Sequence, residues 1–194
     1  MTIDQRASRV GADEVPDLLA LLADVPTERG FERTVGDEAQ ALLADPEAVV
    51  EAIARVTGTG RWWVGVGIGA VEEPVPATVR AARGPALYLA REAVERAARE
   101  TAGLALAVPE SAAEAGTDAE TALQALGHLL AERTDAGREA VATLARHRTQ
   151  RAAAAELGIS AQAVSERLAL ARPGDEARLR TLAVRLLRRA HAEV

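Results

Sequence analysis

Residues 149–168 read TQRAAAAELGISAQAVSERL, and this stretch predicts two short helices joined by a tight turn. Gly158 supplies the positive φ that such a turn needs, and Ala154 is small where the two helices would cross. Apolar residues recur at helical spacing along one face of the second helix, which indicates that this face is buried. The positions expected to be buried are Ile159, Val164 and Leu168.

The second helix of this pair would present a polar face to a partner. Ser160 is placed to cap it, so the residues that follow can face outward. Glutamine suits the edge of adenine and arginine that of guanine, which makes Gln162 and Arg167 candidates for reading bases. Arginines near the start of the first helix are placed to hold phosphates. The predicted DNA-binding residues are Arg148, Gln150, Arg151, Ser160, Ala161, Gln162, Ala163, Ser165, Glu166 and Arg167, with Arg146 as a further phosphate contact.

This stretch resembles the helix-turn-helix of sigma-70 region 4 and of many bacterial regulators, through the pattern TQxxAAxxLGISxxAVSxRL. The resemblance implies that the second helix enters the major groove of double-stranded DNA. One such unit contacts few bases, so we expect a homodimer or a partner such as RNA polymerase. Residues 173–194 read as a helix, which favours a helical over a winged variant. Two alternatives stay open: a plain three-helix bundle, and a module that contacts protein instead of DNA.

The composition excludes several kinds of protein. The chain has 194 residues, no Cys, and only Trp62, Trp63, Tyr88 and Phe31 as aromatic residues, so its core must be built from Ala, Leu and Val. Without Cys there is no disulfide, thiolate nucleophile or Cys-ligated zinc. No apolar run approaches the ~20 residues of a membrane span, and the amino terminus lacks a signal-peptide pattern, so we expect a cytoplasmic protein with no membrane partner. All 23 basic residues are Arg, which is typical of a GC-rich, actinobacterial-type genome.

Charge divides unevenly along the chain, although the formal net charge is -6. Residues 1–116 carry 11 Arg and 19 acidic residues, whereas residues 117–194 carry 12 Arg and 10 acidic residues. A basic carboxyl-terminal segment behind an acidic body is expected where one part touches an anion and the other does not. For the charge alone, a solvated helix face is the favoured explanation.

The amino-terminal part mixes strand and helix patterns, and it predicts an α+β fold. Gly36-Asp37 reads as the turn of a hairpin. Gly65, Gly67 and Gly69 lie on one face of a strand at period two, which leaves room for a helix backbone or a ligand. We expect one ferredoxin-like sheet with its helices on one face. The predicted strands are 1–4, 31–35, 38–43, 61–71 and 104–108, and the predicted helices are 13–24, 46–56 and 86–101.

Residues 109–118 are small and polar and predict a linker between two domains, 1–108 and 119–194. Beyond it the sequence reads as helical throughout. The predicted helices are 118–133, 135–146, 149–157, 160–171 and 175–191.

Several short segments of the first domain resemble the SatD-like family, over roughly residues 1–100. They are Asp4, the hairpin at 33–38, the glycines at 65–69, and helical residues at 83–86 and 90–93. Members of this family are similar to the catalytic domain of nucleotide cyclases and GGDEF proteins, and actinobacterial relatives join it to a helix-turn-helix. The resemblance implies a cyclase-like fold in which Asp4 and Asp37 face each other and hold Mg²⁺ on a triphosphate.

The hairpin departs from the GGDEF pattern, with Val35 in place of the first Gly and Ala39 in place of Phe, and the chain has no Lys to pair with phosphate. We therefore expect a domain that is not an enzyme and holds no cofactor, and that senses a ligand or mediates assembly. We therefore expect the protein to be a DNA-binding transcriptional regulator. The alternative is a Mg²⁺-dependent enzyme that binds or hydrolyses nucleotides with Asp4, Asp37 and Glu38.

Overall fold

The structure is a computed structural model that describes residues 1–6 and 11–194. The chain forms two compact units. The first consists of Met1–Ala131 together with Leu179–Val194, and the second of Glu132–Arg178. These bounds differ from the predicted division at 109–118, because the helices at both ends of the carboxyl-terminal part pack into the first unit.

The first unit has an α+β fold built on a five-stranded sheet of order β2-β3-β1-β4-β5. Every neighbouring pair of strands is antiparallel except β4 and β5, which are parallel. The order of strands and helices along this part of the chain is the predicted one, and residues 34–37 form the connection of the β2–β3 hairpin. The strands are β1 (Thr2–Gln5), β2 (Arg29–Arg33), β3 (Glu38–Leu42), β4 (Trp62–Gly67) and β5 (Leu104–Ala107).

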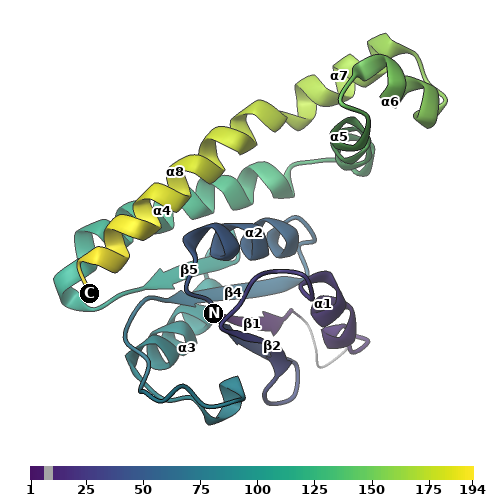
Figure 1. The fold of residues 1–194 in the computed structure, drawn as a ribbon. Coiled ribbons are helices and arrows are strands. Elements are labelled where there is room, and N and C mark those ends of the chain that lie inside the picture. The colour runs from purple at the N-terminus through teal and green to yellow at the C-terminus, as the bar shows by residue number, and fades with distance from the viewer. Residues whose placement is uncertain (7–10) are drawn as a thin grey trace. The chain divides into compact units, whose positions relative to one another are not determined.

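Helices cover both faces of this sheet, so the prediction that they lie on one face is wrong (Figure 1). On one side, α2 (Pro46–Thr57) packs over the core that contains Ile3, Val64 and Val66. On the other side, α3 (Pro85–Ala97) lies directly on the glycines of β4. A Cβ atom on Gly67 would stand 2.3 Å from both the Ala86 carbonyl oxygen and the Ala90 nitrogen. The bare face that the sequence indicated is therefore occupied by a helix backbone.

The segment predicted to be a linker is instead folded. Residues Glu110–Ala112 form a short 3-10 helix (η2), and α4 (Ala113–Ala131) follows without a break. Ala115 of α4 is fully buried in the core of the first unit. Glu120 accepts a hydrogen bond from the Leu106 backbone N–H at 2.8 Å, which ties α4 to the edge strand β5. The small residues that predicted a linker instead allow α4 to pack closely in the core of the first unit.

Two further helices and a 3-10 turn complete the first unit. These are α1 (Val15–Leu21), η1 (Val79–Ala81) and the carboxyl-terminal part of α8 (Pro173–Ala192). In this last part, Leu187 and Ala190 are buried in the same core as α2 and α4. No helix among the described residues combines the length and the apolar character needed to cross a membrane.

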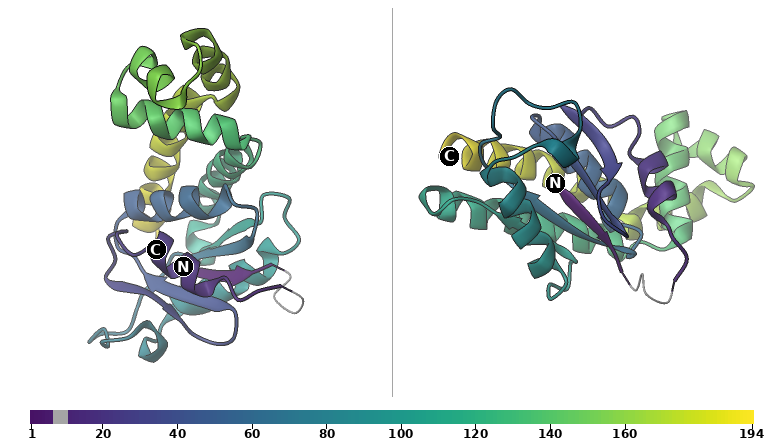
Figure 2. Two further views of the ribbon diagram at one scale, coloured as in Figure 1. Left: turned by 90° about the vertical axis from the view of Figure 1, so that its right-hand side faces the viewer. Right: turned by 90° about the horizontal axis from the view of Figure 1, so that it is seen from below.

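The second unit is helical, and three of its helices pack together around a small core (Figure 2). They are α5 (Asp135–His147), α6 (Gln150–Leu157) and α7 (Ala161–Ala171), all within one or two residues of their predicted bounds. Each begins at a hydroxyl residue whose side chain accepts a hydrogen bond from the backbone, as N-caps do. The buried core residues are Ala140, Ala153, Ala154, Val164 and Leu168.

Candidate nucleic-acid interface

The connection between α6 and α7 has the geometry that the sequence predicted. Gly158 has φ 66°, in the left-handed region that favours glycine. The backbone N–H of Ile159 then donates to the Ala154 carbonyl at 3.2 Å. Ser160 caps α7, because its Oγ accepts a hydrogen bond from the Ala163 N–H at 3.1 Å. These bonds fix the angle at which α7 leaves the turn.

Helix α7 buries one stripe and exposes the opposite face. Val164 and Leu168 lie in the core of the second unit. The predicted reading residues Ala161, Gln162, Ser165 and Glu166 are all exposed, while Ala163 is half-buried. Gln162 donates from Nε2 to the Glu166 Oε1 at 3.1 Å, so its amide is held along the helix. The exposed face of α7 therefore carries amide, hydroxyl and carboxylate groups that can exchange hydrogen bonds with a partner.

Arg167 is half-buried and lies beside a carboxylate of α5. Its Nη1 lies 3.4 Å from the Glu139 Oε2 of α5, and its side chain is 32% exposed. The helical position beside the buried stripe brings Arg167 close to α5, and its base-reading role stays a prediction. Glu139 lies ten residues before the quoted motif, so the motif gave no sign of the pair.

The arginines before α6 differ in how far they are engaged. Arg146 pairs with Glu156 at 2.5 Å, and His147 contacts the same carboxylate. Hydrogen bonds from His147 and Arg146 lower the pKa of Glu156. Arg148 and Arg151, by contrast, are exposed and form no ion pair with a described residue. Together with exposed Gln150, they leave two unneutralised cations at the amino-terminal end of α6.

Charge in the second unit is nearly balanced. Residues 132–178 contain 8 Arg and 7 acidic residues. Any attraction to an anionic partner therefore comes from the placement of particular arginines and not from a general positive charge.

The predicted metal residues lie in the first unit, at the other end of the chain. Asp4 stands opposite Glu38 in the register of β1 and β3. Glu38 is buried, accepts a hydrogen bond from the Thr34 Oγ1 at 2.5 Å and pairs with Arg91 of α3. Burial, followed by the charges of Asp37 and Glu38, raises the pKa of Asp4 to about 6. Asp4 therefore lies close enough to Asp37 and Glu38 for their charges to act on it.

The prediction that Asp4 and Asp37 hold Mg²⁺ on a triphosphate stays a prediction. Within residues 1–6 and 11–194, no group of three or more His, Asp or Glu side chains is arranged to hold a metal ion. Arg91 of α3 pairs with Glu38, so this carboxylate already has a cationic partner. The histidines are dispersed: His128 contacts Thr101 at 3.1 Å, and His147 contacts Glu156.

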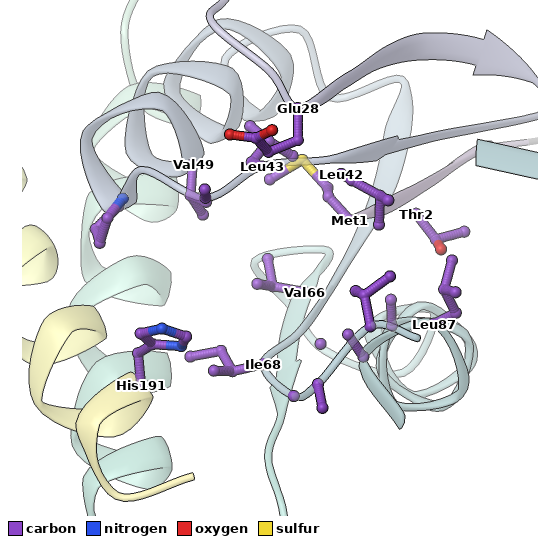
Figure 3. Close-up of a pocket in the computed structure, with 18 of the residues that line it drawn as sticks. Met1, Thr2, Glu28, Leu42, Leu43, Val49, Val66, Ile68, Leu87 and His191 are labelled. Atoms are coloured by element: carbon purple, nitrogen blue, oxygen red, sulfur yellow. The ribbon is translucent and has the colours of Figure 1, made fainter. Parts of the chain in front are cut away.

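The first unit also contains a cavity of about 470 Å³ that sequence reasoning missed (Figure 3). Val66 and Ile68 line it from the end of β4, and Leu187 and His191 line it from α8. Figure 3 shows the Glu28 carboxylate at one end of this cavity and the His191 ring beside Ile68. The lining residues come from widely separated segments, so no local pattern could have indicated it.

Comparison of the chain with protein families, with curated proteins and with solved structures finds no match.

Proposed function

We propose that this protein is a cytoplasmic DNA-binding transcriptional regulator in which α6 and α7 form a helix-turn-helix and α7 enters the major groove. The observation that carries the proposal is that two features occur together. One is the exposed polar face of α7, and the other is the pair Arg148 and Arg151 near the start of α6, which form no ion pair with any residue that the structure describes. Helix-turn-helix proteins divide the work in this way, with backbone contacts that position the protein and a second helix that reads bases.

The solvent-exposed side chains of α7 would contact the bases. Gln162 presents an amide that matches adenine, and Ser165 can donate or accept with either base of a pair. Arg167 remains a candidate for reading guanine, although its side chain also lies 3.4 Å from the Glu139 carboxylate. Arg148 and Arg151 would bind phosphates.

The α+β unit is proposed to sense a ligand or to mediate assembly. Its strand order and its acids at Asp4 and Asp37 agree with a ferredoxin-like, cyclase-like domain of the SatD type. A homodimer would place two copies of α7 on successive half-sites, and RNA polymerase is the alternative partner.

The test begins by selecting tight-binding sequences from a random duplex library with the full-length protein. Fluorescence anisotropy then compares the selected duplex with a scrambled one between 50 and 200 mM salt. Replacing Arg148 and Arg151 by Ala should weaken binding to both duplexes and lower the salt slope by about 1.8, since each phosphate contact contributes about 0.9. Replacing Gln162 and Ser165 by Ala should reduce only the preference for the selected duplex.

The matched control is Arg83→Ala with Arg99→Ala, which removes the same charge from exposed positions of the first unit. This variant should bind like the wild type. If the control variant loses the same affinity, the effect of replacing Arg148 and Arg151 comes from net charge alone. Failure to enrich any sequence, with no salt-dependent binding, would rule out DNA reading and favour a module that contacts protein.

A further inference from the structure

The cavity of the first unit is large enough for a small organic ligand, and strands, helices and one loop line it. Its volume of about 470 Å³ lies within the range of about 300–1,000 Å³ that small-molecule sites occupy. Val66, Ile68 and Leu87 give it an apolar interior, and each belongs to or adjoins a regular element of the sheet or α3.

One wall is a loop between β4 and α3, and hydrogen bonds anchor this loop to the sheet. Arg29 of β2 donates from Nη2 to the Val75 carbonyl at 2.8 Å and also contacts the Pro76 carbonyl. The Arg80 backbone N–H donates to the Glu32 Oε1 at 2.8 Å. Because these bonds tie the loop at two places, the cavity is a preformed feature of the unit.

The charges at the cavity select the kind of ligand. Among the residues described, the ionisable side chains that line it are Glu28, Glu73 and His191, and no arginine does. The Met1 amino group also belongs to the lining and donates to the Ala41 carbonyl at 3.0 Å, and its burial lowers its pKa to about 5, so it is mostly uncharged at pH 7. Glu73 turns one oxygen, Oε2, towards the Val75 N–H at 3.0 Å. Glu28 is exposed at the rim and forms no ion pair with a described residue. In a protein with 23 arginines, this arrangement disfavours carboxylates and phosphates and favours a cation.

We propose that this cavity binds a small hydrophobic amine. The apolar body of the amine lies against Val66, Ile68 and Leu87, and its ammonium group pairs with the Glu28 carboxylate. This assignment gives a ligand class to the sensing role proposed above, and in that respect it rests on the proposed function. Helix α8 belongs to both units. It begins at Pro173 in the second unit, and its residues Leu187 and His191 line the cavity of the first unit.

The test measures binding by isothermal titration calorimetry without DNA, so that its outcome is independent of DNA reading. The probes are octylamine, 1-octanol and octanoate at pH 7, which share one apolar chain and differ in charge. We expect octylamine to bind most tightly and octanoate most weakly. Glu28→Gln should weaken octylamine binding about two- to fivefold, the range for an exposed charge pair, and leave octanol binding unchanged.

Two variants test the location by filling the cavity. Ala44→Trp and Val75→Phe add bulk at lining positions that are not fully buried, and both should weaken the binding of all three probes. Glu95→Gln, at an exposed position on α3, is the matched control and should change none of them. Octanoate binding as well as octylamine, or binding that survives both filling variants, would overturn the proposal, as would no binding by any probe.

Calorimetry and the anisotropy titration together separate this proposal from the DNA-reading proposal. If octylamine binds in calorimetry but no duplex is ever bound, the ligand site stands and the DNA function fails. If the duplex is bound but calorimetry shows no amine binding, the reverse holds.

Discussion

Replacing Asp4 by Asn should stabilise the protein at neutral pH and leave its stability unchanged in acid. Burial, together with the charges of Asp37 and Glu38, raises the pKa of Asp4 from 3.8 to about 6 in the folded state. Below pH 3.8 the carboxyl is protonated whether the chain is folded or unfolded, and it contributes nothing. As the pH rises from 3.8 through 6, the unfolded chain ionises first, so folding stability falls and the full penalty applies above pH 6.

The size of the effect follows from this difference in pKa. Two units correspond to about 3 kcal/mol if counted in full. Asp4 is only half-buried, and solvent screening of a partly exposed group reduces the expected gain to about 1–1.5 kcal/mol. With a urea slope of about 2 kcal/mol/M, the midpoint of unfolding should rise by about 0.5–0.7 M at pH 7.5.

The assay is urea unfolding followed by tryptophan fluorescence, since Trp62 and Trp63 both belong to β4 and report on the first unit. Glu95→Gln removes an exposed carboxylate from the same unit and should leave the midpoint unchanged at every pH. A destabilised Asp4→Asn variant at pH 7.5, or a gain that persists at pH 3.5, would refute the reasoning.

Three further variants test the packing and the caps. Gly67→Ala should lower the free energy of unfolding by about 3 kcal/mol, because the added Cβ stands 2.3 Å from the α3 backbone. The control Gly30→Ala, whose nearest atom is at 4.0 Å, should change it by less than about 0.5 kcal/mol. Equal midpoints of the two variants in urea unfolding would mean that α3 does not pack on β4. Ser160→Ala removes the acceptor of the Ala163 N–H and should destabilise α7 by about 1 kcal/mol, seen as faster hydrogen exchange of its first-turn amides; unchanged exchange contradicts the cap. Arg167→Ala should change the free energy of unfolding by less than about 0.5 kcal/mol, because its pair with Glu139 is exposed. If this variant loses its preference at a single base pair in the anisotropy assay, Arg167 reads that base.

Much of the fold could be predicted because its signals are local. Pro46 after Asp45 marks the start of α2, where the Asp45 side chain accepts the Glu47 N–H at 3.0 Å. Gly36-Asp37 marks the hairpin turn, and Gly36 has φ 59°. Ser160 and Gly158 mark the α6–α7 connection in the same way. In each case one residue type satisfies a backbone requirement that neighbours cannot.

What could not be predicted depends on contacts between distant segments. Alanine and glycine at 112–116 read as a linker, but their small side chains let α4 pack on the sheet, where a Cβ on Gly116 would meet the Val108 Cγ2 at 2.5 Å. The pair Arg167–Glu139 and the cavity are likewise spatial. Sequence periodicity identifies which side of an element is apolar, and it does not identify what that side meets.

Two accounts of the α+β unit make predictions at separate places in the sheet. Asp4 stands opposite Trp63 near the start of β4, whereas the cavity is lined by Val66 and by residues beyond the end of that strand. A nucleotide-binding enzyme would depend on Asp4, and a sensor of hydrophobic amines would depend on Glu28. Asp4→Asn should therefore leave octylamine binding intact, and Glu28→Gln should leave the pH dependence of stability intact. If either variant altered both properties, the acidic cluster and the cavity would have to be treated as one site.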